Sequence, residues 1–196
     1  MSKDICDDIC VDVARKIGEV GPSVAVALEF PMSSYFDVLR GLVDNFAHEK
    51  GMQCIYITSA VPAKTIQGTL EALEIDPSGI SFVDTISQMI MEPLERGSTS
   101  IIYVESPTVL ENVVLKVDYL NRKLKEGPKL VVVDSINSLA IHNDAKMLSE
   151  FLHVLISCLS AKEAYPVILS MQEQLRPDVH EMLTLVCDRV INLGEP

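Results

Sequence analysis

The sequence predicts an α/β fold, a three-layer α/β/α sandwich around a mostly parallel central sheet. Short apolar runs without polar alternation recur along the chain, and strands of that kind are buried on both faces. Helical patterns of roughly 10 to 20 residues separate them, which is typical of a parallel sheet covered by helices. A chain of 196 residues is most simply one domain and can bury a substantial core.

An amphipathic helix is expected before the sheet begins. Apolar residues recur at every fourth position there: Ile5, Ile9, Val13 and Ile17. This spacing places them on one helical face, and Gly21 and Pro22 interrupt the pattern. We therefore divide the chain into an N-terminal helix packed on the core, residues 1–20, and an α/β domain, residues 21–196.

The remaining elements alternate along the chain. Apolar runs predict strands at Val24–Phe30, Gln53–Thr58, Ile80–Val83, Ile101–Val104, Leu130–Val133, Val167–Leu169 and Val190–Leu193. Helical spacing predicts helices from about Ser34 to Lys50 and over Ala63–Leu73, Ile86–Glu95, Leu110–Leu124 and Met147–Leu159. The order is that of a sheet built from parallel strands and crossover helices.

Composition argues against several classes of partner. The formal net charge is −12, whereas nucleic-acid binding needs a basic face. The basic cluster of Arg122, Lys123 and Lys125 ends a predicted helix, where cations complement the helix dipole. No apolar run approaches the roughly 18 residues of a membrane span, and Met1–Asp8 is too acidic for a secretory signal. We expect a cytoplasmic protein that binds neither nucleic acid nor membrane.

Motifs of other enzyme classes are absent from the sequence. It contains no G-x-S-x-G, G-x-G-x-x-G or H-E-x-x-H pattern. The five cysteines and four histidines show no metal-ligand spacing. We therefore expect no metal site and reduced cysteines.

Several short motifs instead resemble one ATPase family. They are Leu28-Glu29 before a loop, Tyr56-Ile57-Thr58 after a helix ending at Lys50-Gly51, Asp134-Ser135 after an apolar strand, and the closing segment Asp188–Leu193. Over nearly all of residues 20–194 the pattern resembles the RecA-like ATPases, and within them the KaiC-like family. The resemblance implies a RecA-like P-loop NTPase fold.

The resemblance also fixes the positions of the phosphate loop, G-x-x-x-x-G-K-[ST]. Without a gap between Glu29 and Thr58, its glycines fall on Phe30 and Tyr35, its lysine on Phe36 and its Mg²⁺-binding hydroxyl on Asp37. Glycines let backbone N–H groups surround phosphates, and the lysine neutralises them. The degenerate Walker A loop consists of Phe30, Pro31, Met32, Ser33, Ser34, Tyr35, Phe36 and Asp37.

We expect this loop to form a capping box at the start of a helix. In Ser34-x-x-Asp37, the hydroxyl of Ser34 would accept a first-turn N–H, and the carboxylate of Asp37 would reach back to the cap. The carboxylate would also lie at the positive end of the helix dipole. The alternative is an ordinary helix start in an unrelated fold.

A second catalytic element is missing from the pattern. After Tyr-Ile-Thr the family usually has an acidic pair that includes the glutamate orienting the attacking water, but this chain has Ala60 and Val61. Asp134-Ser135 matches the end of a Walker B motif, either as a Mg²⁺ ligand through water or as a structural carboxylate. The absence of the phosphate-binding glycines and lysine favours the structural role. Gln172 and Glu173 occupy the place of a sensor residue.

These features predict a pseudo-ATPase with no catalytic residue and no cofactor. It would act as a protein-interaction or regulatory module, with a protein partner or as a homo-oligomer. The alternative is a noncanonical ATP-binding protein or ATPase that uses Asp134 with Ser33, Ser34 and the loop backbone, and binds ATP and Mg²⁺.

Overall fold

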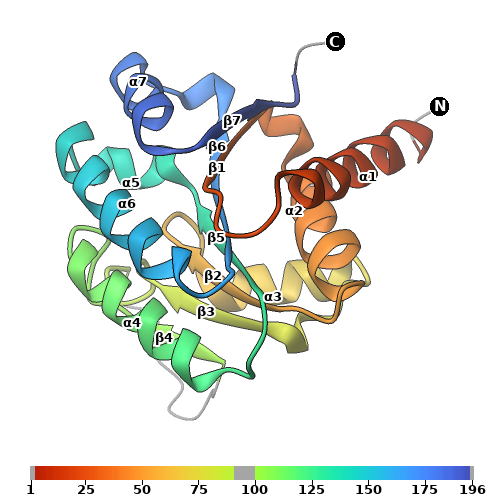
Figure 1. The fold of residues 1–196 in the computed structure, drawn as a ribbon, viewed down its shortest axis with the longest axis horizontal. Helices are drawn as coiled ribbons and strands as arrows, with labels where there is room; N and C mark the ends of the chain where they lie inside the picture. The colour runs from red at the N-terminus through yellow and green to blue at the C-terminus, as the bar shows by residue number, and fades with distance from the viewer. Residues whose placement is uncertain (1–2, 91–99, 195–196) are drawn as a thin grey trace.

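The computed structural model describes residues 3–90 and 100–194, and the side chains of residues 9–90 and 100–194. A seven-stranded sheet in the order β4-β3-β2-β5-β6-β1-β7 forms its centre, and helices cover both faces (Figure 1). Every paired strand runs parallel to its neighbour. The predicted three-layer α/β/α fold with a parallel sheet is therefore confirmed.

The elements follow the predicted alternation. The strands are β1 Val26–Phe30, β2 Gln53–Thr58, β3 Ile80–Asp84, β4 Ile101–Tyr103, β5 Lys129–Asp134, β6 Tyr165–Met171 and β7 Arg189–Asn192. The helices are α1 Lys3–Val20, α2 Tyr35–Arg40, α3 Ala63–Ala72, α4 Leu110–Lys123, α5 Ile136–His142, α6 Ala145–Ser160 and α7 Pro177–Val186. Shorter or irregular helical segments are η1 Met32–Ser34, the π-helical η2 Gly41–His48, η3 Pro77–Gly79 and η4 Gln172–Gln174.

Two apolar clusters fill the space between the layers. One cluster joins the sheet to α4, α5, α6 and α7 on one face, and the other joins it to α1, α2, η2 and α3 on the opposite face (Figure 1). The N-terminal helix α1 packs through Val13 and Ile17, which are 0% and 1% exposed. A Cβ atom on Gly41 would lie 2.7 Å from the carbonyl oxygen of Cys10, so α1 approaches the start of η2 closely.

The predicted helix Ile86–Glu95 is wrong over the part that the structure describes. Residues 86–90 form bends and turns, and residues 91–95 lie outside the described residues. The reason is the buried carboxylate of Asp84, which accepts the N–H groups of Ile86 and Ser87 at 3.0 and 2.9 Å. These bonds fold the chain into a tight turn directly after β3.

Two helices were not predicted. Helix α5 begins directly after the Asp134-Ser135 motif and spans only 7 residues, which is too short for a clear apolar period. Helix α7 begins at Pro177, a residue favoured in the first turn of a helix. Among the described helices, none has the length and apolarity needed to cross a membrane.

Candidate functional site

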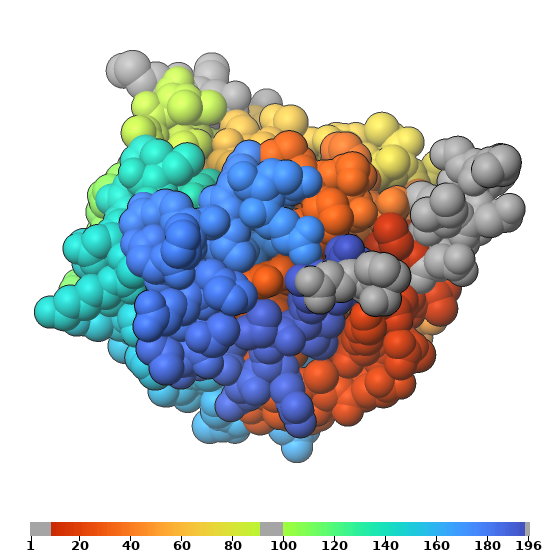
Figure 2. Space-filling view, turned by 90° about the horizontal axis from the view of Figure 1, so that it is seen from above, coloured from red at the N-terminus to blue at the C-terminus, as the bar shows by residue number. Residues whose placement is uncertain are grey.

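The candidate site lies where β1, β2, β5 and β6 end. Ligands of open α/β sheets collect at the carboxyl ends of the strands. Figure 2 shows this end of the molecule, with the segment that follows β1 beside the one that follows β6. The main side chains of the site come from the start of α2, from β2, from the end of β5 and from η4.

The sequence-predicted residues take these places. Phe30 ends β1, Pro31 precedes η1, Met32, Ser33 and Ser34 form η1, Tyr35, Phe36 and Asp37 form the first turn of α2, Asp134 ends β5, and Ser135 precedes α5. The fold brings only part of this set together. In the described part of the chain, Asp134 is hydrogen bonded to Tyr35 but not to Ser33 or Ser34.

Two tyrosines bind the carboxylate of Asp134. The hydroxyl of Tyr35 donates a hydrogen bond to Oδ2 of Asp134 at 2.6 Å, and the hydroxyl of Tyr56, on β2, donates to the same oxygen at 2.5 Å. The two hydroxyls lie 3.3 Å apart. Asp134 is 5% exposed and Tyr56 is 0% exposed. One carboxylate oxygen is thus an acceptor for two phenols in a closed environment.

Burial sets the protonation of this cluster. It raises the pKa of Asp134 above its ordinary value of 3.8, although the hydrogen bonds from Tyr35 and Tyr56 oppose the rise. Burial also raises the pKa of Tyr35 and of Tyr56, and the nearby Asp134 adds to both increases. Both phenols therefore keep their protons at neutral pH and act as donors.

A second carboxylate binds the backbone of the loop. The oxygens of Glu173, on η4, lie 2.9 and 3.1 Å from the backbone nitrogen of Met32. In a phosphate-binding loop, backbone N–H groups of this kind point at the anion. Here an N–H of the loop already donates to an internal anion.

The backbone around Asp134 is fixed by neighbouring hydroxyls and an amide. The N–H of Ser59 donates to the carbonyl oxygen of Asp134 at 2.9 Å, and the hydroxyls of Ser59 and Ser138 lie 2.5 Å apart. Asn137 donates to the carbonyl oxygen of Met171 at 3.0 Å and accepts its N–H at 2.8 Å. These bonds tie the ends of β2, β5 and β6 together beneath the site.

One expectation about hydrogen bonding needs correction. The predicted capping box of Ser34 and Asp37 is wrong, because the Ser34 side chain makes no capping bond to α2. The chain enters α2 through η1, where the N–H of Ser34 donates to the carbonyl oxygen of Pro31 at 2.9 Å. A capping box forms instead between Ser135 and Ser138 at α5. Asp37 does lie in the first turn of α2.

Three apolar side chains that follow β1 or β2 are exposed, and two of them, Phe36 and Val61, stand where the resemblance expects charged groups. Phe36 is 50% exposed, Met32 44% and Val61 37%. Val61 follows β2, and the hydroxyl of Thr58 donates to its carbonyl oxygen. Neither Ala60 nor Val61 can act as a general base, since both side chains are hydrocarbon.

Sequence reasoning missed several polar contacts of the site. It treated Tyr35 only as bulk and did not single out the hydroxyl of Tyr56. It also missed Glu29, 5% exposed, whose Oε1 lies 2.7 Å from Nδ1 of His180. A tyrosine in the middle of an apolar strand was the available signal, because a buried phenol usually has a hydrogen-bond partner.

Comparisons with known proteins agree with this fold. The model of a family of unknown function (DUF7090) matches residues 38–196. Among solved structures, a KaiC-like protein from Pyrococcus horikoshii OT3 is 15% identical with a TM-score of 0.59, covering 88% of this chain and 72% of that one. A search of curated proteins found no match.

Two further solved structures are similar at the same level. A protein from Pyrococcus horikoshii OT3, described only as a structural study, is 12% identical with a TM-score of 0.64, covering 93% of this chain and 88% of that one. The flagellar accessory protein FlaH from Methanocaldococcus jannaschii is 13% identical with a TM-score of 0.59, covering 92% and 76%. Identities this low show the fold alone.

Proposed function

Because this chain belongs to DUF7090, a family of unknown function, and shares the fold of KaiC-like proteins, we propose that it is a pseudo-ATPase. It has a degenerate Walker A loop, hydrolyses no ATP and acts in the cytoplasm as a protein-interaction or regulatory module. Its partner is another protein or further copies of itself.

The observation that carries this proposal is the hydrogen bond from Tyr35 to Asp134, at 2.6 Å. By the resemblance, Tyr35 stands at the second glycine of the phosphate loop, and Asp134 is the Walker B carboxylate. A Mg²⁺ ion needs the oxygen lone pairs of that carboxylate or of waters bound to it. Two phenol protons occupy Oδ2 instead, which leaves this oxygen without a lone pair for Mg²⁺ and disfavours a Mg²⁺–nucleotide complex here.

The loop backbone supports the same conclusion. The N–H of Met32 donates to Glu173, and this carboxylate carries the same sign of charge as a phosphate. A nucleotide would have to displace Glu173 and then bear its repulsion. No lysine at position 36 would compensate, because Phe36 stands there.

The exposed side chains favour a protein partner. Met32, Phe36 and Val61 are exposed and follow β1 or β2 at the carboxyl end of the sheet, and at positions 36 and 61 the resembled ATPases carry charged groups. Exposed apolar groups that gather at one place are typical of interaction surfaces. This placement supports an interaction role for the end of the molecule at which the resembled ATPases bind nucleotide.

Nucleotide titration tests the proposal. We expect no calorimetric heat and no thermal stabilisation of the purified protein with millimolar ATP and Mg²⁺. The Asp134→Ala variant is the matched control for the alternative, a noncanonical ATP site that uses Asp134, Ser33 and Ser34. Stabilisation of the wild type by ATP that is lost in Asp134→Ala would establish that alternative and overturn the pseudo-ATPase.

A further inference from the structure

Within the part of the chain that the structure describes, strand β7 has an open edge. It pairs with β1 and lies at the end of the sheet. The N–H of Arg189 donates to Ala25 at 3.1 Å, and that of Leu193 donates to Glu29 at 2.8 Å. Successive residues of a parallel strand direct their N–H and C=O groups to opposite sides. The backbone groups of Val190 and Asn192 therefore point away from β1.

These outward groups are available for pairing. Beyond the ladder with β1, no backbone hydrogen bond within the described part of the chain reaches Val190 or Asn192. An edge strand with free N–H and C=O groups is a template for another strand. Peptides bind such edges by adding a strand, with affinity from the backbone and specificity from alternate side chains.

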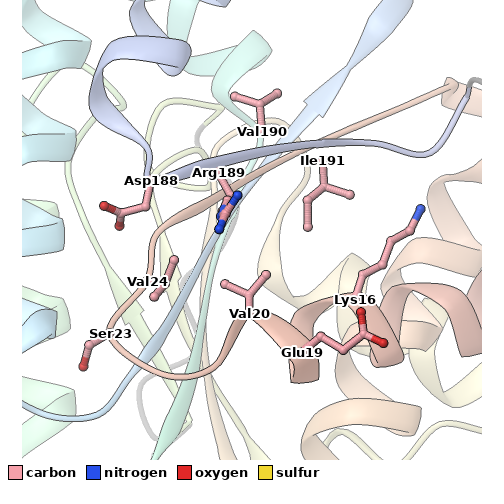
Figure 3. A pocket seen from close by; sticks show the side chains of 9 residues that line it. All are labelled: Lys16, Glu19, Val20, Ser23, Val24, Asp188, Arg189, Val190 and Ile191. Carbon is pink, nitrogen blue, oxygen red and sulfur yellow. The ribbon is translucent and has the colours of Figure 1, made fainter.

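A groove lies beside this edge, on the face that α1 covers. Its volume is about 770 Å³. Figure 3 shows Arg189 and Ile191 pointing toward the α1 side of β7, with Val190 on the other side. Val20, at the end of α1, and Val24 supply further apolar lining. A strand added at the edge would place every second side chain in this groove.

The charges of the groove select the added strand. Three of its charged residues already have partners: Lys16 with Asp12 at 2.8 Å, Glu19 with Arg15 at 2.7 Å, and Asp188 with the N–H of Ala25 at 2.7 Å. Arg189 is exposed and has no ion pair among the described residues. A carboxylate on the added strand would pair with its guanidinium.

We propose that the edge of β7 binds an extended segment of a partner protein as an additional strand. The segment carries an apolar side chain over Val20 and Ile191 and a carboxylate that pairs with Arg189. A second copy of this chain is the poorer occupant, because two copies with a net charge of −12 each repel one another. The edge of β7 is one surface for the interaction role proposed above, and its assignment rests on that proposed function.

A phage-displayed library of short random linear peptides, selected on the wild-type protein, tests the proposal. We expect the selected peptides to alternate apolar residues and to include Asp or Glu. Their affinity is then measured by fluorescence anisotropy on wild type and variants. Val190→Pro removes one outward N–H, and proline is tolerated on an edge strand.

Affinity for Val190→Pro should fall about tenfold, since a ladder hydrogen bond is lost and the ring crowds the edge. Arg189→Glu should weaken acidic peptides about tenfold through charge reversal. Leu115→Ser, on α4 across the sheet, is the matched control and should leave affinity unchanged. In the bound wild type, the amide protons of Val190 and Asn192 should exchange more slowly.

Two results would overturn the inference: a selection without binders, or binders that keep their affinity for Val190→Pro and leave the amide of Asn192 unprotected. Peptides N-methylated at alternate positions test the same ladder without altering the protein, so misfolding of a variant leaves the question answerable. N-methylation in the correct phase should abolish binding. ATP binding by the same samples would refute the pseudo-ATPase alone and would not bear on the edge.

Discussion

Replacing Tyr35 with phenylalanine removes one hydroxyl group and keeps the ring that packs edge-on against Phe36, at 5.2 Å between centroids. The lost bond is the 2.6 Å contact with Asp134. Asp134 keeps the hydrogen bond from Tyr56 but loses the other of the two hydrogen bonds that offset the cost of burying its carboxylate. Deleting a hydrogen bond to a buried acceptor costs about 1–3 kcal/mol, and the upper half of this range applies if the carboxylate is ionised.

For a chain of this size, each kcal/mol lowers the melting temperature by roughly 2–4 °C. We therefore expect Tyr35→Phe to melt about 4–8 °C below the wild type at pH 7 for a loss near 2 kcal/mol. Urea denaturation gives the free energy of unfolding directly. Tyr119→Phe is the control, because Tyr119 is 52% exposed on α4 and its hydroxyl has no hydrogen bond in the described structure.

A double-mutant cycle separates the bond from other effects of the substitution. The cost of Tyr35→Phe should shrink when Asp134 is already asparagine, since the two changes remove the same contact. Equal costs in both backgrounds, or a Tyr35→Phe variant within about 0.5 kcal/mol of the wild type, would refute the view that this hydroxyl closes the site.

Three other predictions follow from the same contacts. Burial raises the pKa of Asp134, so the contribution of this carboxyl to stability is fully present below its ordinary pKa of 3.8 and is lost as pH rises through the raised pKa. Over that window the free energy of unfolding of Asp134→Asn, measured in urea, should rise relative to that of the wild type. A difference in free energy of unfolding that does not change with pH would contradict the raised pKa. Glu173→Ala should change the free energy of unfolding by less than about 0.5 kcal/mol, because the contact between Glu173 and the N–H of Met32 is exposed. The same variant should speed hydrogen exchange of the Met32 amide, and unchanged exchange would show that the carboxylate does not hold the loop. Gly41→Ala should destabilise the protein by about 1–3 kcal/mol through overpacking against Cys10. As a control, Gly68→Ala on α3, which has open space around it, should stabilise the protein by about 0.5–1 kcal/mol. Similar melting temperatures for the two variants would argue against close packing of α1.

The sequence was sufficient for the sheet because buried parallel strands carry a local signal. The run Gln53–Thr58 was predicted with its observed bounds, since continuous apolar residues there are flanked by Gly51 and a serine. The strand at Val167–Leu169 was predicted too short: β6 spans Tyr165–Met171, and Pro166, near its start, pairs with Val131. The predicted helix Ile86–Glu95 is wrong over residues 86–90 because the carboxylate of Asp84 accepts the nearby N–H groups of Ile86 and Ser87. Tertiary packing buries that carboxylate, which also accepts the N–H of Ala63 on α3.

The candidate site divides in the same way. The sequence by itself determined which residue types are absent: residues 30–37 contain no glycine or lysine, and Ala60 and Val61 are hydrocarbon side chains that cannot transfer protons. Those absences are properties of residue types and need no coordinates.

Only the tertiary structure decided what fills the place of the missing groups. Tyr35 and Asp134 are 99 positions apart, as the contact between them records, and Met32 and Glu173 are 141 apart. No local pattern joins residues at such separations; the parallel sheet does so by bringing the carboxyl ends of distant strands to one edge. The open edge of β7 likewise depends on strand order, which pairing across the whole chain sets.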